Sequence, residues 1–177
     1  MSDSQIVLRE SDIQHKIQRL AAQILEECAD VQPLGFVGIY NRGVELAKRV
    51  FDLVKKKRED VFFGTLDISL YRDDFDNRGD IPTLKSSDID FDLQGCHVVL
   101  FDDVLFTGRT TRAAIDALTA YGRPSCIQLA TLVDRGNREL PISADYVGET
   151  LETSREDYVH VRLQGPDNEE SVSLIKS

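Results

Sequence analysis

Apolar residues follow two different spacings along the chain, and the spacing switches several times. Steps of three and four residues are typical of amphipathic helices with one buried face, and they occur at residues 13–28, 44–54 and 109–121. Short continuous apolar runs, typical of strands buried in a parallel sheet, lie between them at Leu34–Tyr40, His97–Phe101 and Ile127–Val133. The sequence therefore predicts helices and strands that alternate.

Weaker patterns extend this arrangement. Val61–Tyr71 alternates toward its end and predicts another strand, and residues 146–147 and 158–163 predict short late strands. Ser11 or Asp12 is expected to cap the first helix. Repeated strand–helix–strand order predicts an α/β fold with a mostly parallel central sheet and helices on both faces. Without a linker or repeat, we expect one domain over residues 1–177.

One long polar segment interrupts the pattern. Residues 72–91 contain Gly79, Pro82 and six aspartates, with few apolar residues. A loop of this length inside a compact domain is usually functional, and active-site lids have this character. We therefore expect a mobile loop at residues 72–91.

The composition narrows the class of protein. The 177 residues carry a net charge of −10, which disfavours nucleic acid over most of the surface. No apolar run is long enough to cross a bilayer, and the N-terminus is polar. Three cysteines (Cys28, Cys96 and Cys126) without a C-x-x-C pair favour buried reduced thiols. We expect a cytoplasmic protein with neither DNA nor a membrane as partner.

The most informative stretch is Val98–Thr110. An apolar strand ends in the carboxylates of Asp102 and Asp103, and Thr107-Gly-Arg-Thr110 then opens a helix. Amides at a helix start bind anions, and Gly108 permits close approach of a phosphate. Carboxylates accept hydrogen bonds and suit sugar hydroxyls. The segment therefore predicts a ribose 5-phosphate site, and it has neither a Walker A nor a Rossmann spacing.

These residues resemble the 5-phosphoribosyl-1-pyrophosphate (PRPP) signature of type I phosphoribosyltransferases. The further blocks Gly38–Gly43, Asp67–Asp74, Gly122–Ser125 and Leu132–Tyr146 are similar to the PyrR family of pyrimidine-operon regulators and uracil phosphoribosyltransferases. The resemblance runs from about Ile6 to about Leu163. It implies a type I phosphoribosyltransferase-like fold and transfer of the phosphoribosyl group from PRPP to uracil, which yields uridine monophosphate (UMP) and diphosphate.

The resemblance also implies roles for individual residues. Asp102, Asp103 and Arg72 would be catalytic, and Asp134 and Arg135 would border the base. The residues implied in PRPP binding are Asn41, Arg42, Asp102, Asp103, Val104, Leu105, Phe106, Thr107, Gly108, Arg109 and Thr110. Mg²⁺ would arrive bound mainly through PRPP, with no metal site of the protein's own. The loop at residues 40–43 is of a kind that often holds a non-proline cis peptide, which a sequence does not reveal.

Two other functions remain open at this point. The resemblance includes binding of leader messenger RNA, with PRPP or UMP sensed in the same pocket. The surfaces expected to contact RNA carry Glu26, Glu27 and Glu149. We therefore expect weak RNA binding. The alternative is that four cations come together across a dimer interface to form a basic patch: Arg9, Lys16, Arg19 and Arg138. A nucleotide sensor with weak catalysis is the other alternative. The resemblance suggests a homodimer or a multiple of dimers.

Overall fold

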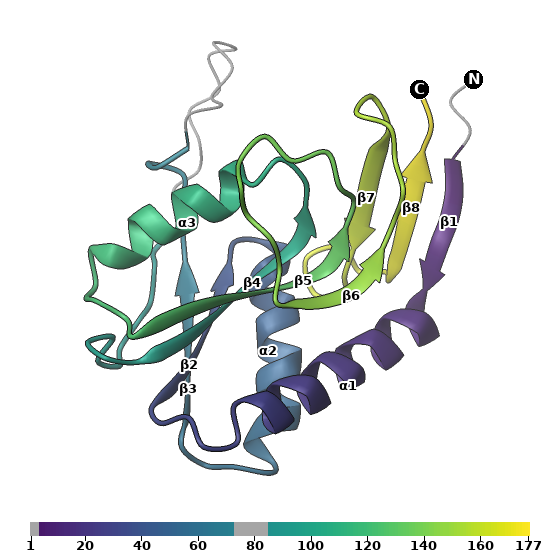
Figure 1. Ribbon diagram of the computed structural model, residues 1–177. Helices are drawn as coiled ribbons and strands as arrows, with labels where there is room; N and C mark the ends of the chain where they lie inside the picture. The colour runs from purple at the N-terminus through teal and green to yellow at the C-terminus, as the bar shows by residue number, and fades with distance from the viewer. Residues whose placement is uncertain (1–3, 73–84) are drawn as a thin grey trace.

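A five-stranded parallel sheet forms the centre of the protein (Figure 1). The structure is a computed structural model, and it describes residues 4–72 and 85–177. The strand order is β3-β2-β4-β5-β6. The strands are β2 (Leu34–Ile39), β3 (Val61–Leu66), β4 (His97–Leu105), β5 (Cys126–Asp134) and β6 (Tyr146–Thr150).

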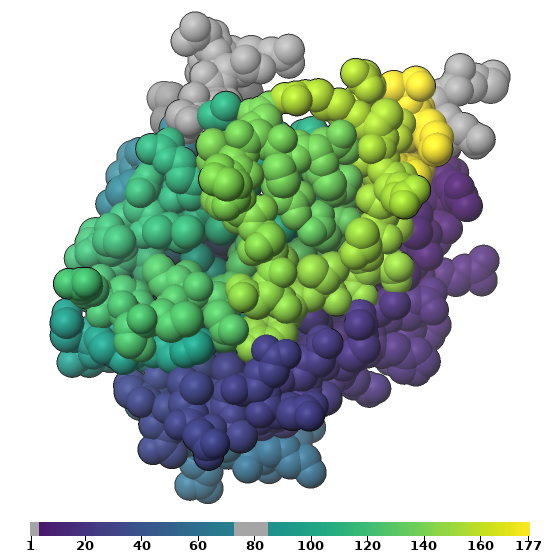
Figure 2. All heavy atoms as spheres, viewed as in Figure 1, coloured from purple at the N-terminus to yellow at the C-terminus, as the bar shows by residue number. Residues whose placement is uncertain are grey.

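Helices cover both faces of this sheet. Neighbouring residues in a strand point to opposite faces, so Phe36 packs on the side of α1 (Glu10–Glu27) and α2 (Arg42–Lys55), while Val37 packs on the side of α3 (Arg109–Thr119). Figure 2 shows the purple surface of α1 beside the yellow-green surface of the last third of the chain. The predicted parallel sheet with helices on both faces is confirmed.

A second, three-stranded antiparallel sheet lies beside α1 and was only partly predicted (Figure 1). Its order is β1 (Ser4–Arg9), β8 (Ser171–Ile175) and β7 (Tyr158–Arg162). The sequence indicated β7 alone. The sheet adds Leu8, Val159 and Val172 to the core on the α1 and α2 side.

Three local predictions were wrong. The first helix begins at Glu10, and Asp12 lies inside it, where its Oδ2 accepts the Arg9 amide N–H at 2.9 Å. β3 ends at Leu66, because the Asp67 carboxylate turns the chain by accepting the Ser69 amide at 2.8 Å. Cys126 is exposed at the first position of β5, whereas Cys28 and Cys96 are buried.

The predicted mobile loop falls largely on residues 73–84, which lie outside the described residues. In the described part of this loop, the backbone of Asp88 forms hydrogen bonds with the backbone of Thr65 in β3. In the described residues, no helix combines the length and the apolar character needed to span a bilayer.

Candidate active site

The carboxyl ends of the parallel strands bring most of the predicted site residues to one edge of the sheet. Open α/β sheets bind ligands at this edge. The segment after β2 holds Asn41 and Arg42, the segment after β3 holds Arg72, and β5 ends at Asp134. β4 itself carries Asp102 and Asp103, and its ladder with β5 pairs Asp102 with Thr131 and then resumes at Val104.

A pocket of about 120 Å³ lies between the end of β4 and the start of α3. It is lined by Arg72, Asp102 and the continuous run from Val104 to Thr111. The hydroxyls of Thr107, Thr110 and Thr111 are donors at a helix N-terminus, which is the arrangement that binds a phosphate group. The pocket therefore has the size and chemistry of a site for one phosphate beside a carboxylate.

Asp102 and Asp103 interact with each other although they are neighbours in a strand. The Asp103 amide donates to Asp102 Oδ1 at 3.0 Å, and Asp102 is only 7% exposed. Burial raises the pKa of Asp102 well above its usual value, and the neighbouring Asp103 carboxylate raises this pKa further, while Arg72 lowers it. Burial and the neighbouring carboxylate therefore oppose ionisation of Asp102 next to the phosphate pocket.

Gly108 makes the turn between β4 and α3. Its φ of +92° lies in the left-handed region, and an added Cβ would lie 3.3 Å from Ile142 and 3.4 Å from Leu140. The segment after β5 thus packs directly on the turn of residues 106–108, which is called the phosphate turn below. Thr107 O accepts the amides of Glu139 at 2.9 Å and Leu140 at 3.1 Å. The turn is held from outside by residues that the sequence patterns did not indicate.

Substitution of Gly108 by alanine should destabilise the protein. We expect a loss of about 1–2 kcal/mol from the left-handed backbone, with a further loss from the contacts to Leu140 and Ile142. Urea unfolding measures this change. Gly95→Ala is the matched control, because Gly95 also has a positive φ of 74° but has open space around it. Equal losses in the two variants would mean that the packing against Ile142 is unimportant.

Arg109 connects this turn to the segment after β5. Its Nε donates to Glu139 Oε2 at 2.6 Å, and Glu139 also pairs with Arg155. The family resemblance implied that Arg109 takes part in PRPP binding. In the structure Arg109 lines the pocket, and its guanidinium also binds the segment after β5.

Asp134 and Arg135 border a larger, open pocket of about 730 Å³. Arg135 is 4% exposed, and its guanidinium lies 4.0 Å over the ring centre of Phe106 and donates to Ser154 O at 2.8 Å. Burial lowers the pKa of Arg135. Because Phe106 belongs to the phosphate turn, this stacking joins the two pockets.

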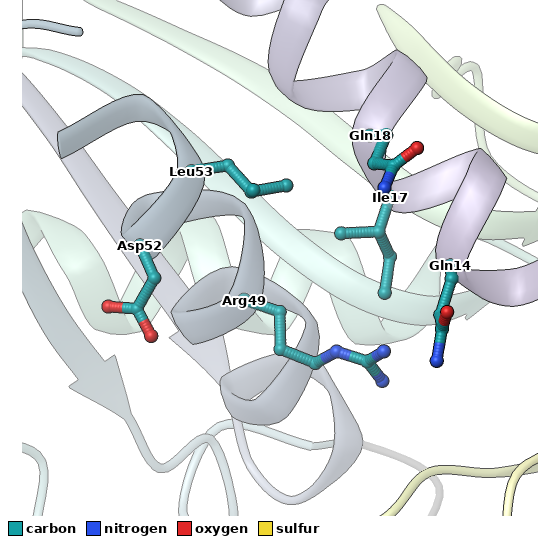
Figure 3. A pocket seen from close by; sticks show the side chains of 6 residues that line it. All are labelled: Gln14, Ile17, Gln18, Arg49, Asp52 and Leu53. Atoms are coloured by element: carbon teal, nitrogen blue, oxygen red, sulfur yellow. The ribbon is translucent and has the colours of Figure 1, made fainter. Parts of the chain in front are cut away.

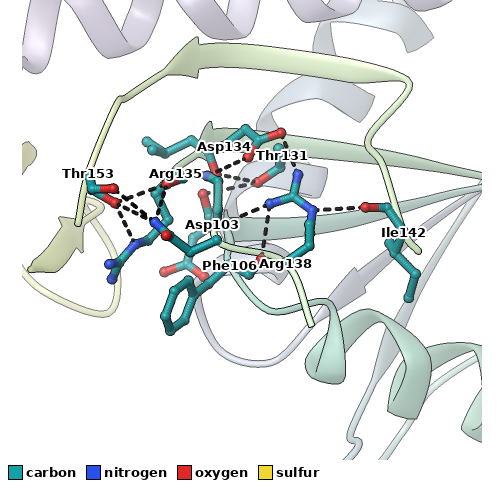
Figure 4. Close-up of polar contacts among 11 residues, drawn as sticks. Asp103, Phe106, Thr131, Asp134, Arg135, Arg138, Ile142 and Thr153 are labelled. Atoms are coloured by element: carbon teal, nitrogen blue, oxygen red, sulfur yellow. Dashed lines mark hydrogen bonds and ion pairs between the residues drawn. The ribbon is translucent and has the colours of Figure 1, made fainter. Parts of the chain in front are cut away.

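Arg138 connects the end of β5 with the phosphate turn through hydrogen bonds (Figure 4). Its Nη2 donates to Asp134 Oδ2 at 2.6 Å, its Nη1 to Phe106 O at 3.0 Å and its Nε to Ile142 O at 2.8 Å. The carboxylate of Asp134 is therefore engaged by Arg138, and its Oδ1 also accepts the Gly136 amide at 3.0 Å.

The start of α2 lies against β4. A Cβ added to Gly43, the second residue of α2, would clash with Phe101 O and would be 3.2 Å from Asp102 Cα, so only glycine allows this approach. The peptide bond between Tyr40 and Asn41 is cis. Arg42, the first residue of α2, forms a bidentate ion pair with Asp167, with distances of 2.9 Å and 2.8 Å. Asp167 was missed, because no local pattern links two residues so far apart.

A hollow of about 270 Å³ lies elsewhere, between α1 and α2 (Figure 3). None of the predicted site residues lines this hollow. Its lining consists of Gln14, Ile17, Gln18, Arg49, Asp52 and Leu53. It therefore takes no part in the arrangement at the carboxyl edge.

Comparison with known proteins adds a family to this geometry. Residues 5–164 match the phosphoribosyl transferase domain family. The chain is 50% identical to the bifunctional protein PyrR of Roseiflexus sp. (strain RS-1), with 94% of this chain and 91% of the relative covered. It is 46% identical to the protein of the same name from Elusimicrobium minutum (strain Pei191), with 93% and 92% covered.

Solved structures give the same fold at much lower identity. The hypoxanthine phosphoribosyltransferase of Trypanosoma cruzi, solved at 1.4 Å, superposes with a TM-score of 0.73 at 17% identity, and the match covers 97% of this chain and 96% of that chain. At this identity the likeness concerns the fold alone.

Proposed function

The chain belongs to the PyrR family of phosphoribosyltransferases, and we propose that it transfers the phosphoribosyl group of PRPP to uracil. The products are UMP and diphosphate. The observation that carries the proposal is the phosphate-sized pocket at the start of α3 with Asp102 in its wall. Uracil as the base follows from the PyrR family.

The end of β4 would bind the ribose 5-phosphate part of PRPP. Thr107, Thr110 and the amides at the start of α3 would donate to the 5-phosphate. Asp102 and Asp103 would accept hydrogen bonds from the ribose hydroxyls. The negative charge of the pair would also stabilise the positive charge that develops on the ribose as its bond to diphosphate breaks.

The leaving group would lie on the loop after β2. Asn41 and Arg42 directly precede Gly43, which lies against the backbone of Asp102, and Arg72 lines the phosphate pocket. Arg42 and Arg72 would stabilise the negative charge that grows on the diphosphate. Catalysis then depends on position and electrostatics, without a covalent nucleophile.

The acidic pair fits a magnesium ion that arrives with the substrate. Carboxylate oxygens are donors that Mg²⁺ prefers, and it commonly binds through one or two carboxylates together with substrate phosphates. Within residues 4–72 and 85–177, no three His, Cys, Asp or Glu side chains group into a metal site. The diphosphate would hold the ion, with Asp102 and Asp103 the nearby protein carboxylates. When bound, magnesium neutralises charge on the leaving group.

The base would enter the open pocket beyond Phe106. Arg135 would border it with a guanidinium already oriented by Phe106 and Ser154, and Asp134 would shape its edge through Arg138. Incubation with PRPP, magnesium and uracil should release diphosphate. A chelator in excess over magnesium should stop the release, and no release in any condition would contradict the proposal.

Leader-RNA binding is the second candidate, since the relatives are named bifunctional. Three of the four cations proposed for RNA contacts are engaged within the chain. Lys16 Nζ pairs with Glu149 Oε2 at 2.6 Å, and Arg19 donates to Val147 O at 3.1 Å. Arg138 donates to Asp134 and to three backbone carbonyls, those of Phe106, Gly136 and Ile142.

We therefore expect weak or absent binding to pyrimidine-operon leader RNA near physiological salt. A protein that contacts six or more phosphates needs a comparable number of available cations, and the Debye length of about 8 Å leaves close repulsion from the exposed Glu26 and Glu27 unscreened. Filter-binding titration with and without UMP measures this affinity. Nanomolar binding that depends on UMP would contradict the expectation and make RNA regulation the better description.

A further inference from the structure

The segment between β7 and β8 is attached to α2 by two ion pairs. Arg42 Nη2 lies 2.8 Å from Asp167 Oδ1, and Arg49 Nη1 lies 2.6 Å from Glu170 Oε1. Arg42 and Arg49 are seven residues apart, which is about two helical turns, so they lie on the same side of α2. Arg42 starts the helix at the candidate active site, whereas Arg49 lies farther along, beside the hollow between α1 and α2 (Figure 3).

Asp167 is itself held firmly. Its Oδ2 accepts the Leu163 amide at 2.9 Å, and its own amide donates to Leu163 O at 3.1 Å. Its side chain is 16% exposed. The hydrogen bonds from Arg42 lower the pKa of Asp167, and Asp167 raises the pKa of Arg42. Both groups therefore stay charged in a fixed geometry.

The guanidinium of Arg42 is only partly used by this pair. Arginine has five N–H bonds in a plane, and Asp167 accepts from Nε and from Nη2. The Arg42 side chain remains 31% exposed. Because the Asp167 carboxylate binds both Nε and Nη2, it fixes the orientation of the guanidinium plane. The direction of the remaining N–H groups of Arg42 is thereby fixed as well.

We propose that Asp167 is a positioning residue that orients Arg42 for the diphosphate of PRPP. This inference rests on the proposed function, since it assigns the loop after β2 to the leaving group. Asp167 is kept on Arg42 by Leu163 and does not leave to compete with the ligand. The small sheet thereby contributes to the main site through the turn between β7 and β8.

Binding of magnesium diphosphate and of UMP to Asp167→Asn tests the proposal by isothermal titration. An amide accepts through one oxygen only, so Arg42 loses its bidentate partner. We expect diphosphate affinity to fall at least tenfold and UMP affinity, which involves no diphosphate, to stay within twofold. Glu170→Gln is the matched control: it weakens the other ion pair of the same segment, and both affinities should stay within twofold.

Any one of five results would overturn the proposal. Unchanged diphosphate binding in folded Asp167→Asn would mean that the carboxylate does not affect diphosphate binding. Tighter binding would mean that the carboxylate competes with diphosphate for Arg42. An equal loss for UMP, or the same diphosphate loss in Glu170→Gln, would reduce Asp167 to a general structural role. A wild-type protein that bound no diphosphate would also remove the basis for it. If the wild type bound diphosphate but made no UMP from uracil, the proposed function alone would fail.

Discussion

Asp103→Asn is expected to lower kcat/KM for PRPP at least tenfold, which corresponds to about 1.4 kcal/mol of transition-state stabilisation. The amide keeps the size of the side chain but loses one acceptor and the negative charge beside the ribose. Asp103 is only partly buried, so the substitution should leave the fold intact. Steady-state kinetics with varied PRPP measures the effect.

Asp92→Asn is the matched control for this substitution. Asp92 is an exposed aspartate just before the opposite end of β4, where it accepts the Gln94 amide at 2.9 Å. Its replacement should leave kcat/KM unchanged. Full activity in a well-folded Asp103→Asn protein would remove Asp103 from the catalytic site.

Asp102→Asn should stabilise the protein at neutral pH while it lowers activity at least tenfold. The pKa of Asp102 is raised in the folded state by burial and by Asp103, so ionisation of this group opposes folding. An amide can still accept the Asp103 N–H without carrying the charge. Each kcal/mol gained should raise Tm by about 2–4 °C in a chain of this size.

The pH dependence of this gain follows from the direction of the shift. Below the unfolded pKa, near the ordinary value of 3.8, Asp102 is protonated in both states and the variant gains nothing. As pH rises above 3.8, the wild type loses stability until the folded pKa is passed. The Tm difference between Asp102→Asn and the wild type should therefore be near zero at pH 4 and positive at pH 8. A lower Tm for the variant at pH 8 would contradict this account.

The central sheet could be predicted because its signal is local. Phe36 and Val37, or Leu100 and Phe101, are apolar neighbours that point to opposite faces, and such a run needs a helix layer on each side. β1 has a single buried residue, Leu8, and its pairing partner β8 lies more than 160 residues away. Its stability comes from that pairing, which no local pattern expresses.

The arrangement of the candidate site was predictable to the same extent. Residues 102–110 are contiguous, so one strand and one helix start place them together. Arg42 and Arg135 were indicated by the family resemblance, but their partners were not. Asp167 is 125 residues from Arg42, and the stacking of Arg135 on Phe106 depends on the packing of β4 beside β5.

Competition among bases tests the central claim most directly. Uracil, hypoxanthine and orotate are supplied together at equal concentration with PRPP and magnesium, and the nucleotides formed are separated and quantified. The account predicts that UMP is the main product and that one diphosphate is released for each UMP formed. Inosine or orotidine monophosphate as the main product, or no nucleotide at all, would contradict it.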